Sequence, residues 1–230
     1  MNKTGWIVFV TVIVLLLGGL VAYARVTNPP VDVSNIENNS IIKASAQNGS
    51  IADHTRGSSA NKLLLIEYGD FQCPSCAEAN SSVNKLVNEY SDSVTFVFRN
   101  FPLVSIHPNA RATAATAEAA GLQGKYWEMH DKLYENQDDW NGLDGSKRTT
   151  LFRQYAETLG LDTKKFDTDV ASKSVTQKIN FDLALGKKLS LSATPTFFLD
   201  GEELDSTTAS NLVQGNLTDV KAKIDALLKK

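Results

Sequence analysis

Cysteine and histidine are scarce in this chain of 230 residues, and their scarcity excludes several kinds of site. The chain has two cysteines, Cys73 and Cys76, and three histidines, His54, His107 and His130. A structural zinc site needs four ligands at short, regular spacing, and these histidines are scattered without such spacing. We therefore expect no metal site and no other cofactor.

Basic clusters are absent as well. The chain carries 23 lysines and arginines against 26 acids, for a net charge of −3, and no basic block is interleaved with aromatic residues. Nucleic-acid-binding surfaces carry such clusters, so we expect no nucleic-acid partner. With 42% hydrophobic and 21% charged residues, the composition is typical of a protein that buries one substantial core.

One long apolar run is present at the amino terminus. Residues 4–24 contain no charge and are flanked by Lys3 and Arg25. A run of this length can cross a bilayer as a helix, which predicts a short cytoplasmic end at 1–3 and a transmembrane anchor at 4–25. The alternative is a cleaved signal, because Ala22-Tyr23-Ala24 matches the small-x-small pattern of signal peptidase sites. Retention predicts a single-pass protein of the cell membrane with the remaining chain outside the cytoplasm, and cleavage predicts a secreted protein.

The segment 26–61 has the composition of a flexible linker. It contains two consecutive prolines, repeated Asn, Ser and Gly, and only the brief apolar pair Ile41-Ile42. Such a segment buries too little apolar surface to fold alone. We expect it to hold a folded domain at 62–230 away from the membrane.

The stretch from Leu63 to Cys76 organises the rest of the chain. Leu63 to Tyr68 is a nearly continuous apolar run, typical of a strand buried on both faces. Helical periodicity follows, which places Cys73 at a helix N-terminus with Pro74 in the first turn. Unpaired amides and the helix dipole favour a thiolate at that position, so we expect the pKa of Cys73 to be low.

Three interpretations of the cysteine pair compete. A zinc half-site lacks two ligands, and a structural disulfide across so short a loop restricts the unfolded chain very little. The third interpretation is a redox pair, in which Cys73 is the nucleophile and the more enclosed Cys76 is the resolving thiol. The redox interpretation requires a suitable fold around the pair.

The remaining pattern supplies the order of elements. A β-branched and aromatic run at 93–101 predicts a second strand, and helical periodicity then extends through about 105–192. Thr196 to Leu199 predicts a third strand, Asp200-Gly201 a hairpin turn, and Asn216 caps a last amphipathic helix. The order is therefore strand, helix, strand, inserted helices, two strands and a helix.

This order resembles the exported DsbA-like thiol-disulfide oxidoreductases, whose α/β fold is thioredoxin-like with an inserted helical subdomain. Here that domain would follow the N-terminal transmembrane or signal helix. The resemblance runs through nearly all of 61–230. It is carried by Glu67-Tyr-Gly-Asp-Phe-Gln-Cys-Pro-Ser-Cys76, His107-Pro-Asn-Ala-Arg-Ala, Lys125-Tyr-Trp-Glu-Met-His130 and Ala193-Thr-Pro-Thr-Phe-Phe-Leu-Asp-Gly201.

The resemblance implies a substrate-binding surface. It makes Pro195 a cis-proline after Thr194, in a loop that faces the cysteines and pairs with extended substrate segments. Pro74 and Ser75, between the two cysteines, belong to the same surface. The sequence departs from the family in having Ala193 where glycine is usual. The alternative for Pro195 is an ordinary trans-proline that begins a strand.

Glu67 is the third candidate catalytic residue beside the two cysteines. In related proteins an acid at this spacing lies beneath the resolving cysteine and handles its proton, and a buried carboxyl with a raised pKa is suited to that role. The alternative is an exposed acid on an edge strand. We interpret Asp70 and Gln72 as turn residues, and His107 and His130 as packing residues of the helical insertion.

The resemblance implies an enzyme that donates the Cys73–Cys76 disulfide to cysteine-containing exported proteins. It also implies reoxidation by a quinone-linked membrane partner, and two cysteines without a dimerisation segment favour a monomer. Two alternatives remain: a reductase or isomerase that uses the same residues, and a non-catalytic peptide-binding or chaperone module. The direction depends on the redox potential, which a sequence does not fix.

Overall fold

The computed structural model describes residues 3–27, 31–57 and 62–229. The chain divides into two compact units, Met1–Asp32 and Val33–Lys230. The first unit contains α1 (Lys3–Thr27), a helix of 25 residues that covers the expected apolar run. Several of its large apolar side chains are exposed, among them Trp6, Leu15 and Leu16. Of the helices in the described residues, none has both the length and the apolar character needed to cross a membrane.

The second unit is built on a five-stranded sheet in the order β1-β3-β2-β4-β5. The central strand β2 pairs parallel with β3 and antiparallel with β4, and every residue of β2 and β3 is buried. This burial confirms the prediction from the apolar runs. The strands are β1 (Thr55–Arg56), β2 (Leu63–Gly69), β3 (Val94–Asn100), β4 (Thr196–Leu199) and β5 (Glu202–Glu203).

The helix that follows β2 begins at the cysteine pair. This helix, α2 (Pro74–Glu89), buries Val83, Leu86 and Val87 in the core, as the periodicity predicts. Two helices close the chain, α9 (Ser206–Val213) and α10 (Thr218–Leu228). Helix α9 was not predicted from the sequence, because its eight residues carry few apolar positions.

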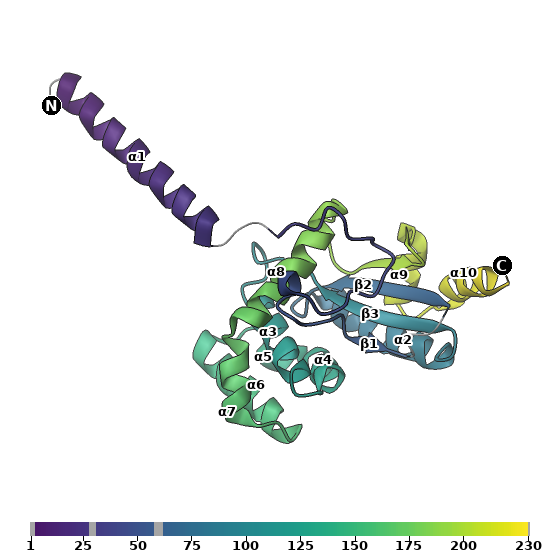
Figure 1. Ribbon diagram of the computed structural model, residues 1–230. Helices are drawn as coiled ribbons and strands as arrows, with labels where there is room; N and C mark the ends of the chain where they lie inside the picture. The colour runs from purple at the N-terminus through teal and green to yellow at the C-terminus, as the bar shows by residue number, and fades with distance from the viewer. Residues whose placement is uncertain (1–2, 28–30, 58–61, 230) are drawn as a thin grey trace. The chain divides into compact units, whose positions relative to one another are not determined.

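Six helices between β3 and β4 form the predicted insertion, and Figure 1 shows them gathered on one side of the sheet, away from α10. Side-chain caps fix several of their starts: Asp162 accepts bonds from the Lys164 and Lys165 amides, as expected. Gly160 follows one of the helices with a φ of 74°, a conformation that suits glycine. The six are α3 (Ala110–Gly121), α4 (Tyr126–Glu135), α5 (Gln137–Trp140), α6 (Gly145–Thr158), α7 (Thr163–Val170) and α8 (Lys173–Lys188).

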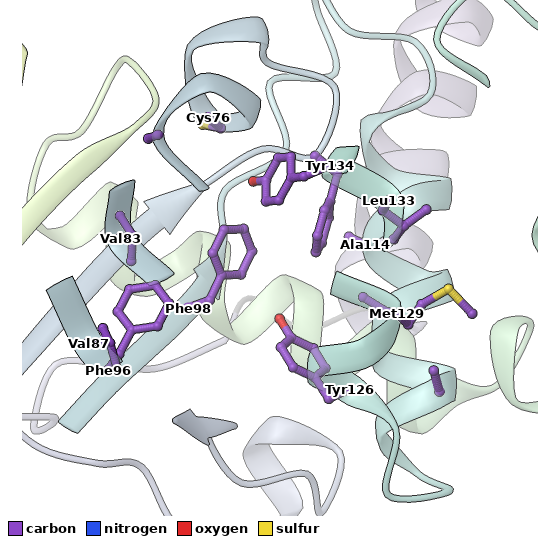
Figure 2. Close-up of a cluster of buried hydrophobic side chains, with 14 of the residues drawn as sticks. Cys76, Val83, Val87, Phe96, Phe98, Ala114, Tyr126, Met129, Leu133 and Tyr134 are labelled. Carbon is purple, nitrogen blue, oxygen red and sulfur yellow. The ribbon is translucent and has the colours of Figure 1, made fainter. Parts of the chain in front are cut away.

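The aromatic residues of α4 belong to the core that joins the insertion to the sheet. Tyr126, Tyr134 and His130 are buried, and His130 packs between Phe98 of β3 and Phe71, with ring centroids 4.8 and 5.3 Å away. Figure 2 shows these tyrosines turned inward with Phe98 and the residues of α2. The interpretation of this aromatic group as core is confirmed for Tyr126 and Tyr134.

The prediction of a flexible linker over 26–61 is wrong for the part from Val33 to Gly57. This segment belongs to the second unit and buries Val33, Ile42 and Ile51 against it. It contains η1 (Ala46–Asn48) and ends in β1, which pairs with β3. Two segments of the predicted linker, 28–30 and 58–61, lie outside the described residues.

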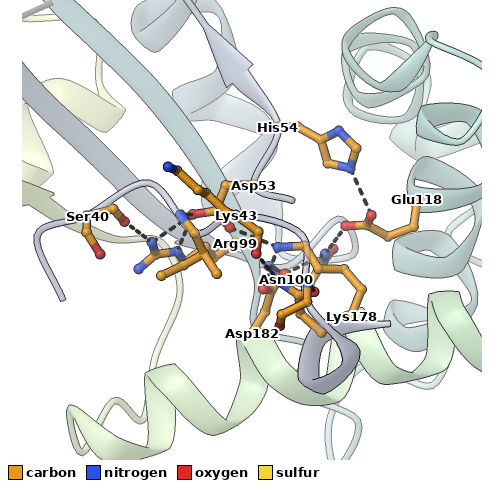
Figure 3. Close-up of polar contacts among 12 residues, drawn as sticks. Ser40, Lys43, Asp53, His54, Arg99, Asn100, Glu118, Lys178 and Asp182 are labelled. Atoms are coloured by element: carbon orange, nitrogen blue, oxygen red, sulfur yellow. Dashed lines mark hydrogen bonds and ion pairs between the residues drawn. The ribbon is translucent and has the colours of Figure 1, made fainter. Parts of the chain in front are cut away.

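A buried ionic cluster explains why a polar segment docks here (Figure 3). The carboxylate of Asp53 lies 2.8 Å from Arg99 Nη2 of β3 and 2.9 Å from Lys178 Nζ of α8. Lys178 also bonds Asp182 at 2.8 Å. Burial raises the pKa of Asp53, but Lys178 and Arg99 outweigh that effect and hold it at about 2. Asp53 thus supplies a negative charge that two buried cations require, and a composition count could not reveal this requirement.

Candidate active site

Cys73 and Cys76 lie at the start of α2, at the carboxyl end of β2. Cys73 is the N-cap residue with an extended backbone, and Pro74 occupies the first helical turn. Cys73 is 7% exposed and Cys76 is fully buried, one turn further in, and both are free thiols. The asymmetry in exposure means that only Cys73 is accessible to another protein's sulfur.

The surroundings of Cys73 favour its thiolate. A hydrogen bond from Cys76 is the largest cause, and donors on the side chain of Thr194 and on the backbone of Cys76 and Ser75 stabilise the thiolate further, against the opposing effect of burial. Together they lower the pKa of Cys73 to about 5. A thiol with this pKa is ionised at neutral pH, which makes it reactive and also a good leaving group.

The pKa values of Cys76 and Glu67 are raised, in contrast to that of Cys73. Burial, the hydrogen bond with Cys73 and the nearby Glu67 raise the pKa of Cys76 well above its ordinary value. Glu67 lies on the central strand β2, is 2% exposed, and its Oε1 has no hydrogen-bond partner among the described residues. Burial, with a smaller contribution from Cys73, raises the pKa of Glu67 to about 8. The alternative of an exposed edge acid is therefore wrong.

The loop before β4 lies against the first cysteine. The Thr194–Pro195 bond is cis, and Cys73 Sγ lies 3.3 Å from the carbonyl oxygen of Thr194. Pro74 and Ser75 are exposed, and Thr194 and Pro195 are half-buried. The structure therefore gathers Cys73, its two neighbours in the motif and this loop on one face, with Cys76 and Glu67 behind it.

Asp70 connects two loops beside the cysteine pair. Its sequence position indicated only a turn residue. Its buried carboxylate accepts hydrogen bonds from the Gln72 and Leu103 amides and lies close to His107 Nδ1, each at 2.8 Å. Its carbonyl accepts from the Cys73 amide at 3.0 Å. Asp70 and His107 therefore hold the loop that precedes Cys73 against the loop that follows β3.

Two buried glutamines connect the cysteine motif to the helical insertion. Gln137 of α5 donates from Nε2 to the carbonyl oxygens of Phe71 at 2.8 Å and Cys73 at 3.1 Å. Gln72 accepts from the Asn109 amide at 2.5 Å and donates to Asn141 Oδ1 at 2.7 Å. These are contacts between residues far apart in the chain. No local sequence pattern predicts these contacts. The His107-Pro-Asn-Ala-Arg-Ala motif does include Asn109, one of the residues involved.

No metal centre accompanies these residues: the described part of the chain contains no group of three His, Cys, Asp or Glu side chains arranged to hold an ion. The site therefore consists of the ionised, accessible thiol of Cys73, the buried thiol of Cys76 and the buried, protonated carboxyl of Glu67. The family model described as "Thioredoxin" matches residues 49–216.

The chain belongs to the thioredoxin family. The thioredoxin-like fold that the resemblance to DsbA-like oxidoreductases implies is confirmed by this family match and by solved structures. A thioredoxin-like oxidoreductase from Silicibacter pomeroyi DSS-3 is 26% identical, with a TM-score of 0.57 over 74% of this chain and 92% of that one. The thiol-disulfide exchange protein α-DsbA2 of Wolbachia pipientis is 17% identical, with a TM-score of 0.62 over 76% and 87%. This second likeness is one of fold.

One curated relative of this chain is a larger protein. The Na⁺/H⁺ antiporter NhaA 1 of Mycolicibacterium vanbaalenii is 39% identical over 151 residues, which are 65% of this thioredoxin-family chain. The match covers 23% of the antiporter, so the chain spans about a quarter of the length of that relative.

Proposed function

We propose that this protein is an extracytoplasmic thiol-disulfide oxidoreductase that introduces disulfides into exported proteins through Cys73 and Cys76. The observation that carries the proposal is the position of Cys73 at the helix start, with Sγ 3.3 Å from the Thr194 carbonyl while Cys76 is fully buried. One sulfur is accessible to a partner and the other is reserved for intramolecular attack.

The first step begins from the disulfide form. A substrate thiolate attacks Cys73 Sγ, the Cys73–Cys76 bond breaks, and its electron pair leaves on the Cys76 sulfur. Cys76 then takes a proton from Glu67, whose pKa of about 8 keeps it protonated at neutral pH. The product is a mixed disulfide between the substrate and Cys73.

The second step releases the oxidised substrate. A second substrate thiolate attacks the substrate sulfur of the mixed disulfide, and Cys73 leaves as a thiolate, stabilised by its low pKa of about 5. Two electrons have then passed from the substrate to the cysteine pair. A quinone-linked membrane partner that removes them would complete the cycle.

The substrate is held beside Cys73 by the exposed face that surrounds it. Thr194 and Pro195 form one side, and Pro74 and Ser75 the other. Pro195 has no N–H, and an extended substrate segment can pair with the free backbone groups of this loop. The interface is made largely by backbone, so it accepts many sequences, as a general oxidase requires.

The amino-terminal unit supports our proposal for the location. Residues 4–24 carry no charge and several large side chains of α1 are exposed, which is unfavourable in water. We propose that this unit anchors a monomer at the cell membrane, with the cysteine pair in the oxidising space where disulfides persist. If the segment is cleaved, the same domain is secreted.

The direction of exchange separates the oxidase from a reductase or isomerase, and equilibration with a glutathione buffer tests it. An oxidase is expected to be mostly dithiol at glutathione ratios that leave a structural disulfide intact, because the Cys73 thiolate stabilises the reduced form. A pair that stays oxidised under those conditions would favour the reductase. Refolding of a reduced substrate protein, with Cys73→Ala as the control, distinguishes both from a non-catalytic chaperone, whose effect would survive this substitution.

A further inference from the structure

Helix α5 reaches the cysteine motif from both of its ends. Gln137, its first residue, donates from Nε2 to the carbonyl oxygens of Phe71 at 2.8 Å and Cys73 at 3.1 Å. Asn141, directly after its last residue, accepts a bond from the Gln72 side chain at 2.7 Å. The helical insertion therefore holds three consecutive residues of the motif by hydrogen bonds.

Helix α5 is itself firmly held within the insertion. Trp140, its last residue, is fully buried, and its ring centroid lies 5.7 Å from that of Phe152 in α6. The indole Nε1 of Trp140 donates to the carbonyl of Leu133 in α4 at 2.8 Å. A side chain on a packed helix keeps its direction better than one on a loop. The two bonds of Gln137 therefore fix the carbonyl groups of the cysteine motif to the insertion.

Asp70 and Gln137 hold opposite kinds of backbone group in the same loop. Asp70 accepts bonds from the amides of Gln72 at 2.8 Å and Cys73 at 3.0 Å, whereas Gln137 donates to carbonyl groups. The Cys73 carbonyl also accepts a bond from the Ala77 amide at 3.2 Å. This bond is the first of α2, because Cys73 is the N-cap residue. Gln137 therefore holds the acceptor at which the active-site helix begins.

The orientation of this carbonyl affects the sulfur of Cys73, because both groups are attached to the same Cα. Backbone donors of Ser75 and Cys76, in the first turn of α2, stabilise the thiolate. A rotation of Cys73 relative to α2 would move the sulfur away from these donors. Carbonyl oxygens that lack a donor would also place partial negative charge beside a thiolate, which disfavours the charged form.

We propose that Gln137 is a positioning residue for Cys73, which holds the Phe71 and Cys73 carbonyls so that the sulfur faces the first amides of α2. Both bonds of Gln137 are to backbone, so it acts on the sulfur through the orientation of Cys73. The inference rests on the role of Cys73 proposed above, but not on the direction of exchange. If Gln137 only satisfied two buried carbonyls, its loss would lower stability and leave the acidity of Cys73 unchanged.

Gln137→Met tests this role, because methionine has a similar length and lacks both N–H donors. The thiolate absorbance of the reduced, full-length variant is titrated against pH. We expect the midpoint for Cys73 to rise by about one unit above that of the wild-type protein. The equilibrium with a glutathione buffer at neutral pH should move about tenfold towards the disulfide, because one unit of pKa corresponds to a factor of ten.

Asn136→Leu is the matched control. It removes a carboxamide from the neighbouring residue, whose Nδ2 donates to the Lys132 carbonyl in the preceding turn at 2.8 Å. This variant should change neither the midpoint nor the equilibrium. An unchanged midpoint in Gln137→Met, or an equal rise in both variants, would overturn the proposal.

Thermal unfolding shows whether each variant is folded. If Gln137→Met does not fold, Gln137→Ala takes its place with the same expected rise, because the smaller side chain leaves room for water at the two carbonyls. Refolding of a reduced substrate protein by the wild-type protein tests the proposed function separately. An active wild-type protein whose midpoint does not respond to Gln137 contradicts only the positioning role. A responsive midpoint in an inactive wild-type protein contradicts only the oxidase function.

Discussion

The sulfur of Cys73 and the carbonyl oxygen of Thr194 lie 3.3 Å apart, across 121 residues of sequence. A thiol can donate to this carbonyl, whereas a thiolate cannot. The Thr194 hydroxyl is buried and has no hydrogen-bond partner among the described residues, so it is free to turn and donate when Cys73 ionises. The residue before the cis-proline is therefore placed to respond to the charge on Cys73.

The first prediction concerns the acidity of Cys73. Thiolate absorbance of the reduced protein should titrate with a midpoint at about 5. Cys76→Ala should raise this midpoint, because it removes the hydrogen bond that contributes most to the low pKa, and Cys76→Ser should raise it less. A midpoint near the free-thiol value of about 8.5 would show that the helix start does not stabilise the thiolate.

Glu67→Gln gives the second prediction. Attack by Cys76 on a mixed disulfide requires the loss of its proton, and Glu67 is the acid buried behind it. The substitution should slow this resolution step by about 10²-fold, a typical effect of a lost general base, and leave the attack by Cys73 nearly unchanged. Stopped-flow measurement of the two steps with a small disulfide checks this. Equal slowing of both steps would point to a structural defect instead.

The third prediction is that the reduced protein is more stable than the oxidised protein at neutral pH. The pKa of Cys73 is lowered, so its thiolate contributes stability that is present above the unfolded thiol pKa and is lost as pH falls through about 5. The raised pKa of Glu67 acts in the opposite sense, since its contribution is lost as pH rises through about 8. Burial is the main cause of that shift in Glu67, and it persists in both redox forms.

The difference in stability between the redox forms therefore isolates the Cys73 contribution. Denaturant unfolding of each form at neutral pH and at a pH below 5 provides this difference. It should favour the reduced form at neutral pH and shrink in acid. A more stable oxidised form at neutral pH would contradict the oxidase proposal and favour a reductase.

Gln137→Ala is the basis of the fourth prediction. The substitution leaves the carbonyl groups of Phe71 and Cys73 without the donor that Gln137 supplies. An unsatisfied buried group costs about 1–3 kcal/mol, so the free energy of unfolding should fall by that order. Gln214→Ala is the control, because Gln214 is exposed and its side chain donates to the Ser210 hydroxyl one turn earlier in the chain. Similar losses in the two variants would show that the contact with α5 contributes nothing specific.

The fifth prediction concerns the amino terminus. Cell fractionation should place the full-length protein with the membranes, and removal of residues 1–27 should release it into the soluble fraction. N-terminal sequencing of the mature protein identifies its first residue. A soluble mature protein that begins at Arg25 would show that the Ala22-Tyr23-Ala24 site is cleaved.

Local patterns were sufficient to predict the elements that carry the cysteines. The run from Leu63 to Tyr68 and the periodicity after Cys76 each report on neighbouring residues, and the burial of Glu67 followed from its place in the apolar run. The resemblance to a family supplied Thr194-Pro195, which no periodicity could place beside Cys73.

Long-range polar contacts account for what the sequence did not predict. The segment around Asp53 was interpreted as a linker because it is polar, yet its partners Arg99 and Lys178 lie 46 and 125 residues away. Gln137 likewise meets the cysteine motif from 64 residues away. A polar side chain gives the same local signal whether it is solvated or buried against a distant partner.

The ionic cluster around Asp53 also sets an order for folding. Asp53 is synthesised before β2, whereas Lys178 and Asp182 belong to α8, near the end of the helical insertion. Because synthesis proceeds from the amino end, Arg99 of β3 is available to Asp53 first, but the cluster is complete only once α8 has been made, and contacts of such high sequence separation slow folding. Until α8 is made, Asp53 lacks Lys178, the second of its two cationic partners. The segment from Val33 to Gly57 therefore completes its buried contacts late, although it is among the first parts of the domain to be made.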